Sequence, residues 1–263
     1  MNKLAEAKKI VVKIGTSTLT YDNGMINLRR IERLIKVLAD LNNSGREIIL
    51  VSSGAIAVGV AELGLKERPQ DTPSKQAAAA VGQCELMYLY DKLFAEYGKT
   101  VAQILLTRDV VESPLLKNNV INAFNRLLEM GAIPVVNEND SVSVEELEFG
   151  DNDTLSAIVA VLVNADALVL LSDIDGLYDD DPRKNPNAQL IPYVHEIDES
   201  IEALAGTAGT SRGTGGMVTK VQAAKVAFGN NIPMAIINGD SPALIYDLFD
   251  GKPCGTLFIK KQG

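Results

Sequence analysis

Short, unbroken runs of apolar residues recur along the chain, and each run stops at a group of small or polar residues. The runs are rich in Val, Ile and Leu and do not alternate between apolar and polar positions. That pattern is typical of strands covered on both faces in a parallel sheet, since an exposed face would place polar residues at every second position. The expected strands are 10–14, 47–51, 101–106, 132–136, 167–171 and 232–237.

Helical patterns separate these runs. Between the first two, apolar residues recur at intervals of three and four from Leu28 to Leu41, with Asn27 placed to cap the helix and Gly45 to end it. The alternation of strands and helices predicts an α/β fold, a three-layer α/β/α sandwich with a mainly parallel central sheet. Because no linker-like segment interrupts it, we expect residues 1–263 to form a single domain. Further helices are expected at about 55–63, 74–97, 114–130, 152–164, 217–229 and 242–249.

The charge balance excludes several classes of partner. The chain carries 34 acidic and 25 basic side chains, a formal net charge of −9, whereas a nucleic-acid binder or a protein of anionic membrane surfaces needs a basic face. Two cysteines are too few for a disulfide framework, and a single histidine makes a zinc protease or a Ser/His/Asp triad improbable. With no signal-peptide pattern and no apolar run of membrane-spanning length, we expect a cytoplasmic enzyme.

Small hydroxyl, amide and acidic residues gather after four of the expected strands. They are 15–17, 52–54, 137–140 and 172–173. Ligands of open α/β sheets bind at the carboxyl ends of the strands, so these residues are candidates for a polar binding site. Turn formation alone accounts for part of the enrichment.

Two features are typical of phosphate binding. Residues 206–216 contain five glycines before a helix that carries Lys220 in its first turns, so backbone N–H groups, a helix N-terminus and an ammonium could meet one anion. Lys13 stands inside the apolar first strand, where an unpaired ammonium is costly. The alternatives are a plain surface loop for the glycines and a lysine whose ammonium reaches past the strand end to solvent.

Other motifs have simpler interpretations. Asp151, Asn152 and Asp153 precede a helix after an acidic stretch, 141–149, that could form a hairpin; one of the three is enough to cap the helix. No dinucleotide-binding or P-loop pattern is present. We expect 179–183 to be a solvated turn and His195 to be structural or on the surface. Tyr88 and Tyr90 are expected on a core-facing helix.

Taken in order, the residues 12–17, 51–55, 137–140, 150–153, 172–178 and 213–220 resemble the amino-acid kinase family. The resemblance runs from residue 8 to about residue 260 and implies the amino-acid kinase fold, in a short form without the C-terminal PUA domain that longer members carry. The segments 150–153 and 213–217 are more similar to members that act on L-glutamate than to those that act on acetylglutamate, carbamate, aspartate or uridylate.

The resemblance implies a reaction and its partners. ATP, with Mg²⁺, would phosphorylate the side-chain carboxylate of L-glutamate and give L-glutamyl 5-phosphate and ADP, the first step of proline biosynthesis. It further implies a homo-oligomer, a dimer or a tetramer, with proline as a possible feedback inhibitor. The alternatives are a sibling kinase, such as one for acetylglutamate, and a non-catalytic sensor of nucleotide or amino acid on the same fold.

The resemblance also assigns residues to roles. The catalytic group would be Lys13, Lys220 and Asp153, with the aspartate orienting the two lysines. Glutamate would contact Ser53, Asp140 and Asn152, with Asp140 receiving the substrate ammonium. No protein residue is expected to hold the metal. ATP would contact Lys13, Ser172, Asp173, Thr214, Gly215, Gly216, Met217, Val218, Thr219 and Lys220.

Overall fold

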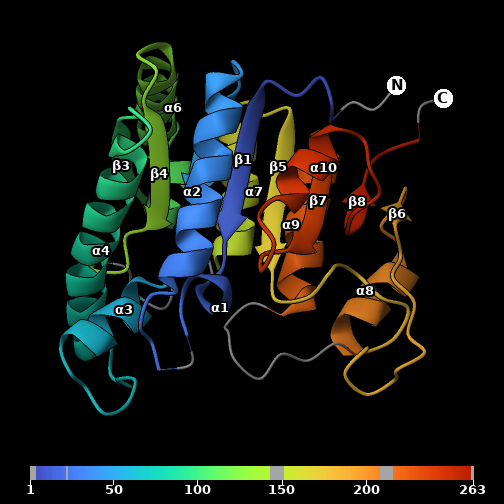
Figure 1. Ribbon diagram of the computed structural model, residues 1–263, viewed down its shortest axis with the longest axis horizontal. Helices are drawn as coiled ribbons and strands as arrows, with labels where there is room; N and C mark the ends of the chain where they lie inside the picture. Colours follow the sequence, from blue (N-terminus) through green and yellow to red (C-terminus); the bar gives the residue numbers. More distant parts are fainter. Residues whose placement is uncertain (1–3, 22, 143–150, 208–215, 262–263) are drawn as a thin grey trace.

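The computed structural model describes residues 4–21, 23–142, 151–207 and 216–261 (Figure 1). These residues build an eight-stranded sheet in the order β3-β4-β2-β1-β5-β7-β8-β6, in which every neighbouring pair is parallel except β7 and β8. All six expected strands and the mainly parallel sheet are confirmed. The strands are β1 (Lys9–Ile14), β2 (Glu47–Val51), β3 (Val101–Leu106), β4 (Ile133–Glu138), β5 (Ala167–Ser172), β6 (Tyr193–Val194), β7 (Met234–Asn238) and β8 (Thr256–Phe258).

The expected helices are also present. Asn27 caps α2 (Leu28–Asn43), its side chain accepting a hydrogen bond from the Arg30 N–H at 3.2 Å, and Gly45 follows the helix with φ +92°. Three further helices, α1, α5 and α8, and the short strands β6 and β8 were absent from the list of expected elements. The helices are α1 (Thr16–Leu19), α2 (Leu28–Asn43), α3 (Ala55–Glu62), α4 (Thr72–Ala95), α5 (Arg108–Glu112), α6 (Pro114–Glu129), α7 (Asn152–Leu162), α8 (Glu199–Thr207), α9 (Met217–Gly229) and α10 (Leu244–Phe249).

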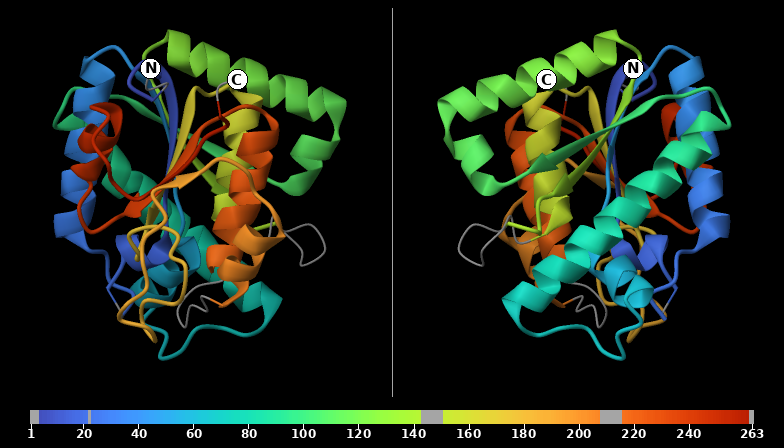
Figure 2. Two further views of the ribbon diagram at one scale, coloured as in Figure 1. Left: turned by 90° about the vertical axis from the view of Figure 1, so that its right-hand side faces the viewer. Right: turned by 90° about the vertical axis from the view of Figure 1, so that its left-hand side faces the viewer.

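Helices cover both faces of the sheet, as Figure 2 shows. In β1, Ile10, Val12 and Ile14 belong to the core under α2, α3, α4 and α10, while Val11 faces the second core under α6, α7 and α9. Both sets of side chains are therefore buried, which is the physical reason that the strand sequence shows no alternation. None of the helices within the described part of the chain is both long and apolar enough to cross a membrane.

One expectation about the core is half wrong. Tyr90 is fully buried under the sheet and its hydroxyl hydrogen-bonds Ser52 Oγ at 2.7 Å. Tyr88, however, is 61% exposed, because two residues along a helix correspond to a rotation of about 200°, which turns the second side chain away from the core.

The sheet topology brings the polar strand ends together. The strands β4, β2, β1 and β5 are adjacent and parallel, so their carboxyl ends lie along one edge of the sheet. This edge carries the four polar groups that the sequence places after these strands. In Figure 1 it is the lower edge, next to α1 and α3.

Helices α3 and α4 cross with their backbones in close contact at Gly59 and Gly82. A Cβ added at Gly59 would lie 1.8 Å from the carbonyl oxygen of Ala78, and one added at Gly82 would lie 1.8 Å from that of Ala55. Both obstacles are backbone atoms, so any larger residue must push the helices apart. The crossing fixes the start of α3, and therefore the polar segment 52–54 that leads into it.

We expect Gly82→Ala to lower the free energy of unfolding by about 3 kcal/mol, since overpacking against backbone cannot be relieved by a rotamer change. Urea denaturation monitored by circular dichroism measures the loss. Gly229→Ala is the matched control, because a Cβ there meets nothing within 4 Å; its effect should stay within about 1 kcal/mol. Equal stabilities of the two variants would contradict the packing argument.

Candidate active site

One residue of the site is a buried lysine at the end of β1. Lys13 is the penultimate residue of β1 and lies on the same face of the sheet as Val11, toward α7. It is only 7% exposed, and its ammonium nitrogen lies 2.6 Å from Asp153 Oδ1. The interpretation of Lys13 as a lysine that reaches past the strand end to solvent is therefore wrong: the charge remains inside, held by an opposite charge.

Asp153 is available for this contact because its neighbour caps the helix. Asp151 is the N-cap of α7, and its carboxylate accepts hydrogen bonds from the N–H groups of Asp153 at 2.6 Å and Thr154 at 2.9 Å. Of the three polar residues in succession, one caps the helix and the other two, Asn152 and Asp153, make contacts with distant parts of the chain.

The Asp153 carboxylate joins three groups. Its Oδ1 pairs with Lys13, while its Oδ2 lies 3.1 Å from Lys220 Nζ and accepts a hydrogen bond from Thr219 Oγ1 at 2.9 Å. Burial by itself raises the pKa of this carboxyl, but the charges of Lys13 and Lys220, with hydrogen bonds from Lys13 and Thr219, outweigh it and lower the pKa to about 2. The carboxylate is thus ionised at every physiological pH.

Two positive charges meet one negative charge at this point. Lys220, like Lys13, is 7% exposed, and Asp153 is 1% exposed, so the three groups form a buried cluster with a net charge of +1. In surroundings of low dielectric constant the remaining charge attracts an anion strongly. The cluster is suited to hold a group such as phosphate.

A hydrogen-bond network surrounds Asn152. Its Nδ2 donates to the Ser52 carbonyl oxygen at 2.7 Å, to Ser53 Oγ at 2.9 Å and to Asn137 Oδ1 at 2.9 Å. The ends of β2 and β4 and the start of α7 are thereby tied together. Asn152 and Ser53, both expected in the site from sequence, are in direct contact.

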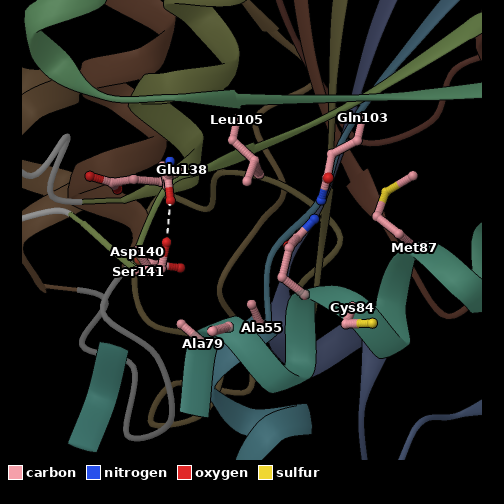
Figure 3. Close-up of a pocket in the computed structure, with 12 residues that line it drawn as sticks. Ala55, Ala79, Cys84, Met87, Gln103, Leu105, Glu138, Asp140 and Ser141 are labelled. Atoms are coloured by element: carbon pink, nitrogen blue, oxygen red, sulfur yellow. Dashed lines mark hydrogen bonds between the residues drawn. The ribbon is translucent and has the colours of Figure 1, made fainter. Parts of the chain in front are cut away.

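A cavity of about 390 Å³ lies beside this network, between α4 and the ends of β3 and β4 (Figure 3). Asp140, to which the family resemblance assigns the substrate ammonium, is among the residues that line it. Gln103 projects into it from β3, and Ala55 and Ala79 lie on the opposite side. The residues of its wall are Ala55, Ala79, Ala80, Gln83, Cys84, Met87, Gln103, Leu105, Glu138, Asn139, Asp140 and Ser141.

A second, smaller pocket lies at the end of β5. Ser172 and Asp173 line it together with Met217 and Lys220 of α9. Residues 179–183, expected to be a solvated turn, contribute as well: Asp181 is only 5% exposed, and the Arg183 guanidinium lies 3.4 Å from Asp173. The expectation is wrong for Asp181, since a run of charges in a sequence does not reveal that the loop folds back onto the sheet.

The remaining predicted residues lie at the start of α9 or directly before it. Gly216 precedes α9 in an extended conformation, Met217 is buried, and Val218 is 44% exposed. Thr214 and Gly215 lie outside the described residues, as does most of the possible hairpin at 141–149.

Three residues to which the sequence assigns no role also lie at the site. Arg183 and Gln83 line the two pockets, and Asn137, one of the polar residues noted after β4, connects Gln83 to Asn152. Of these, only Asn137 had a sequence signal, its position after a strand. His195 is remote from this edge, and its Nδ1 bonds the Ile259 carbonyl oxygen at 2.8 Å, which agrees with a structural or surface role.

The fold and the site together suit a protein that binds a phosphate-bearing anion at the carboxyl edge of a parallel sheet. Comparisons place it more narrowly. A model of the amino acid kinase family matches residues 8–238. A glutamate 5-kinase of Clostridium perfringens (strain 13 / Type A) is 56% identical over 264 residues, which span 99% of this chain and 98% of the relative. One of Listeria innocua serovar 6a is 53% identical, over 98% of this chain and 95% of the relative.

Solved structures agree in fold. A UMP kinase from Bacillus anthracis superposes with a TM-score of 0.63 at 15% identity, covering 97% of each chain. An isopentenyl phosphate kinase superposes with a TM-score of 0.67 at 17% identity, covering 95% of this chain and 99% of the other. The chain belongs to the amino acid kinase family.

We expect Asp153→Asn to lower the free energy of unfolding at pH 7 by about 3–5 kcal/mol, because it leaves two buried ammonium groups without a counter-charge. The carboxyl has a pKa of about 2 in the folded protein against an ordinary value of 3.8. Its contribution is therefore complete above pH 3.8 and is lost as the pH falls toward 2. Urea denaturation between pH 7 and pH 2 should show the wild type and the variant converging below pH 4.

Asp240→Asn provides the control. This aspartate pairs with Arg30 at 2.6 Å but its side chain is 57% exposed, so its removal should cost less than about 1 kcal/mol. A loss at Asp153 no larger than that at Asp240 would contradict the role of Asp153 as the buried counter-charge.

Proposed function

We propose that this protein transfers the γ-phosphoryl group of ATP to the side-chain carboxylate of L-glutamate, giving L-glutamyl 5-phosphate and ADP. The observation that carries the proposal is the buried pair of lysines on one carboxylate, Lys13 and Lys220 on Asp153. It is supported by the names of the relatives at 53–56% identity, each of which is a glutamate 5-kinase. The reaction would be the first step of proline biosynthesis.

The chemistry suits a site without a histidine. The nucleophile is a carboxylate, ionised at neutral pH, so no general base has to remove a proton. What the protein has to supply is alignment of donor and acceptor, worth on the order of 7–11 kcal/mol, and stabilisation of the charge on the transferring group. The two lysine ammonium groups and the Asp153 carboxylate, with a net charge of +1, supply that charge stabilisation.

Lys13 and Lys220 would lie on either side of the transferring phosphoryl group. Their ammonium nitrogens are 2.6 and 3.1 Å from opposite oxygens of the Asp153 carboxylate, which fixes their separation before the substrates bind. Preorganised charge of this kind does not have to reorient during the reaction. Asp153 is then a positioning residue, and the lysines are the catalytic residues.

The nucleotide would occupy the side of β5 and α9. Ser172, Asp173 and Met217 line the pocket there, and the segment from Thr214 through Val218 and Thr219 leads into Lys220. Arg183 lines the same pocket, where its guanidinium pairs with Asp173. A helix N-terminus preceded by glycines is a favourable site for phosphate oxygens.

Mg²⁺ would arrive with ATP. Within the described residues no group of three or more His, Cys, Asp or Glu side chains lies close enough together to hold a metal ion, and Asp153 is occupied by lysines. Mg²⁺ favours phosphate oxygens and water over a protein cage, so the donor set fits a metal brought by the nucleotide. When bound, it neutralises part of the phosphate charge.

L-Glutamate would occupy the side of β2 and β4. Ser53, Asn152 and Asp140 lie on this side of the lysine pair, and Asp140 would receive the substrate ammonium. The strand order places β1, with Lys13, between β2 and β5, so the amino acid and the nucleotide would approach the lysines from opposite sides.

The same proposal includes the domain organisation, the cellular location and the oligomeric state of the enzyme. We expect residues 1–263 to act as a single amino-acid kinase domain, in the cytoplasm, as a homo-oligomer of two or four chains. Both cysteines are free, as expected in a reducing compartment. Proline, which shares the ammonium and α-carboxylate of glutamate, would compete for the substrate side of the site.

We expect Lys220→Ala to lower kcat by two to three orders of magnitude, since removal of one preorganised donor raises the barrier by about 3–4 kcal/mol. Release of ADP in the presence of ATP, Mg²⁺ and L-glutamate measures the rate, and hydroxylamine traps the acyl phosphate as a hydroxamate. Lys225→Ala is the control on the same helix, because that lysine pairs with Glu202 on the surface. A kcat within threefold of the wild type for Lys220→Ala would remove this lysine from the mechanism.

A substrate panel separates the sibling activities. The wild type should form hydroxamate from L-glutamate at least 100 times more efficiently than from N-acetyl-L-glutamate, because acetylation removes the ammonium that Asp140 would receive. Asp140→Asn should raise KM for L-glutamate and leave KM for ATP unchanged. A preference for the acetylated substrate would favour the acetylglutamate alternative, and binding of both ligands without any ADP release would favour the sensor.

A further inference from the structure

The orientation of one side-chain amide in the cavity can be deduced from a backbone group. Asn137 accepts a hydrogen bond from the N–H of Glu138 at 2.9 Å. A backbone N–H can only donate, so the Asn137 atom that faces it must be the carbonyl oxygen Oδ1. The same oxygen accepts from Asn152 Nδ2 at 2.9 Å, so the two contacts agree.

This orientation determines that of Gln83. The Asn137 Nδ2 group, opposite Oδ1, lies 2.9 Å from Gln83 and can only donate, so Gln83 must present its carbonyl oxygen there. The Gln83 Nε2 group then faces the other way. Gln83 lines the 390 Å³ cavity, and among the residues that the structure describes none accepts a hydrogen bond from Nε2.

The amide of Asn152 has a fixed orientation as well. Its Nδ2 protons are directed at three oxygens of the protein, those of Ser52, Ser53 and Asn137. Its Oδ1 is the atom left to accept a hydrogen bond from a ligand. One chain of three amides therefore offers an acceptor at the Asn152 end and a donor at the Gln83 end.

We propose that Gln83 is a substrate-binding residue whose Nε2 group donates a hydrogen bond to the α-carboxylate of the amino-acid substrate. The inference rests on the proposed function, since it takes the ammonium of the same substrate to lie at Asp140, which lines the same cavity. The ammonium and the α-carboxylate are attached to one carbon atom, so a donor and an acceptor that line the same cavity suit them. Gln83 thereby selects for a free α-carboxylate.

The position of Gln83 is fixed from two sides. It follows Gly82, whose close contact with Ala55 sets the distance between α4 and α3, and its carbonyl oxygen is tied to β4 through Asn137. Of the two carboxylates of the wall, Asp140 would face the substrate ammonium, and Glu138 extends away from Gln103 and Met87 in Figure 3. A donor held in place costs little conformational entropy when the ligand binds.

The experiment changes only the donor. Gln83→Glu keeps the shape and the oxygen that accepts from Asn137, and it replaces the NH₂ group with a second oxygen. We expect KM for L-glutamate to rise at least 30-fold, with kcat and KM for ATP within threefold of the wild type. L-Isoglutamine, in which a carboxamide replaces the α-carboxylate, should gain relative to glutamate by at least tenfold in kcat/KM.

Two control variants distinguish a loss of substrate recognition from the effects of an added charge and of misfolding. Gln222→Glu makes the same change on the exposed side of α9 and should leave all constants unchanged. Gln83→Met removes the donor without adding charge and should raise KM for L-glutamate about tenfold; it replaces Gln83→Glu if that variant loses its circular dichroism spectrum. If KM for L-glutamate stays within threefold in the folded variants, Gln83 is only a structural support and the inference is overturned.

Calorimetry with L-glutamate distinguishes this failure from failure of the proposed function. If the wild type forms no hydroxamate but binds glutamate, and Gln83→Glu binds it at least 30-fold more weakly, the proposed reaction fails while the recognition of the α-carboxylate holds. If the wild type neither phosphorylates nor binds L-glutamate, both are overturned.

Discussion

The contact on which the rest of the site depends is that of Asp153 with Lys13 and Lys220. The three residues come from the start of α7, the end of β1 and the first turns of α9, and they meet in a place where almost no water reaches them. Two ammonium groups would repel each other there, and one carboxylate holds both within 3.1 Å. Because that carboxylate neutralises only one of the two charges, the cluster retains the positive charge that a phosphoryl group requires.

This arrangement accounts for how a strongly acidic protein would accept anionic substrates. The net charge of −9 is spread over the surface, where salt screens it beyond about 8–10 Å. The positive charge of the lysine pair is buried and is screened much less. The net charge therefore excludes broad classes of partner, while the binding of anionic substrates depends on the few buried charges of the lysine pair.

Substrate recognition in the cavity depends on which amide atom donates and which accepts each hydrogen bond. A single backbone N–H, that of Glu138, fixes which atom of Asn137 faces which neighbour, and the consequence passes to Asn152 in one direction and to Gln83 in the other. The site would thus distinguish the two ends of an α-amino acid through amides whose orientation the fold has already set. Preorganisation of this kind links the packing of α3 against α4 to the recognition of the substrate.

The strands, the edge of the sheet that can bind a ligand and four of the site residues could be predicted from the sequence. Apolar runs without alternation predict strands covered on both sides, and polar residues after those runs predict which edge can bind a ligand, because these properties are local.

The sequence also singled out Lys13, Asn152, Asp153 and Lys220. It could not show that Asp153 pairs with both lysines, that Asp181 is buried, that Tyr88 is exposed or that Gln83 faces the cavity. Those facts depend on the strand order and on the distance between α3 and α4, which bring together residues as far apart in the chain as Lys13 and Asp153. Local pattern decides which groups are available, and only the packing of distant segments decides which of them meet.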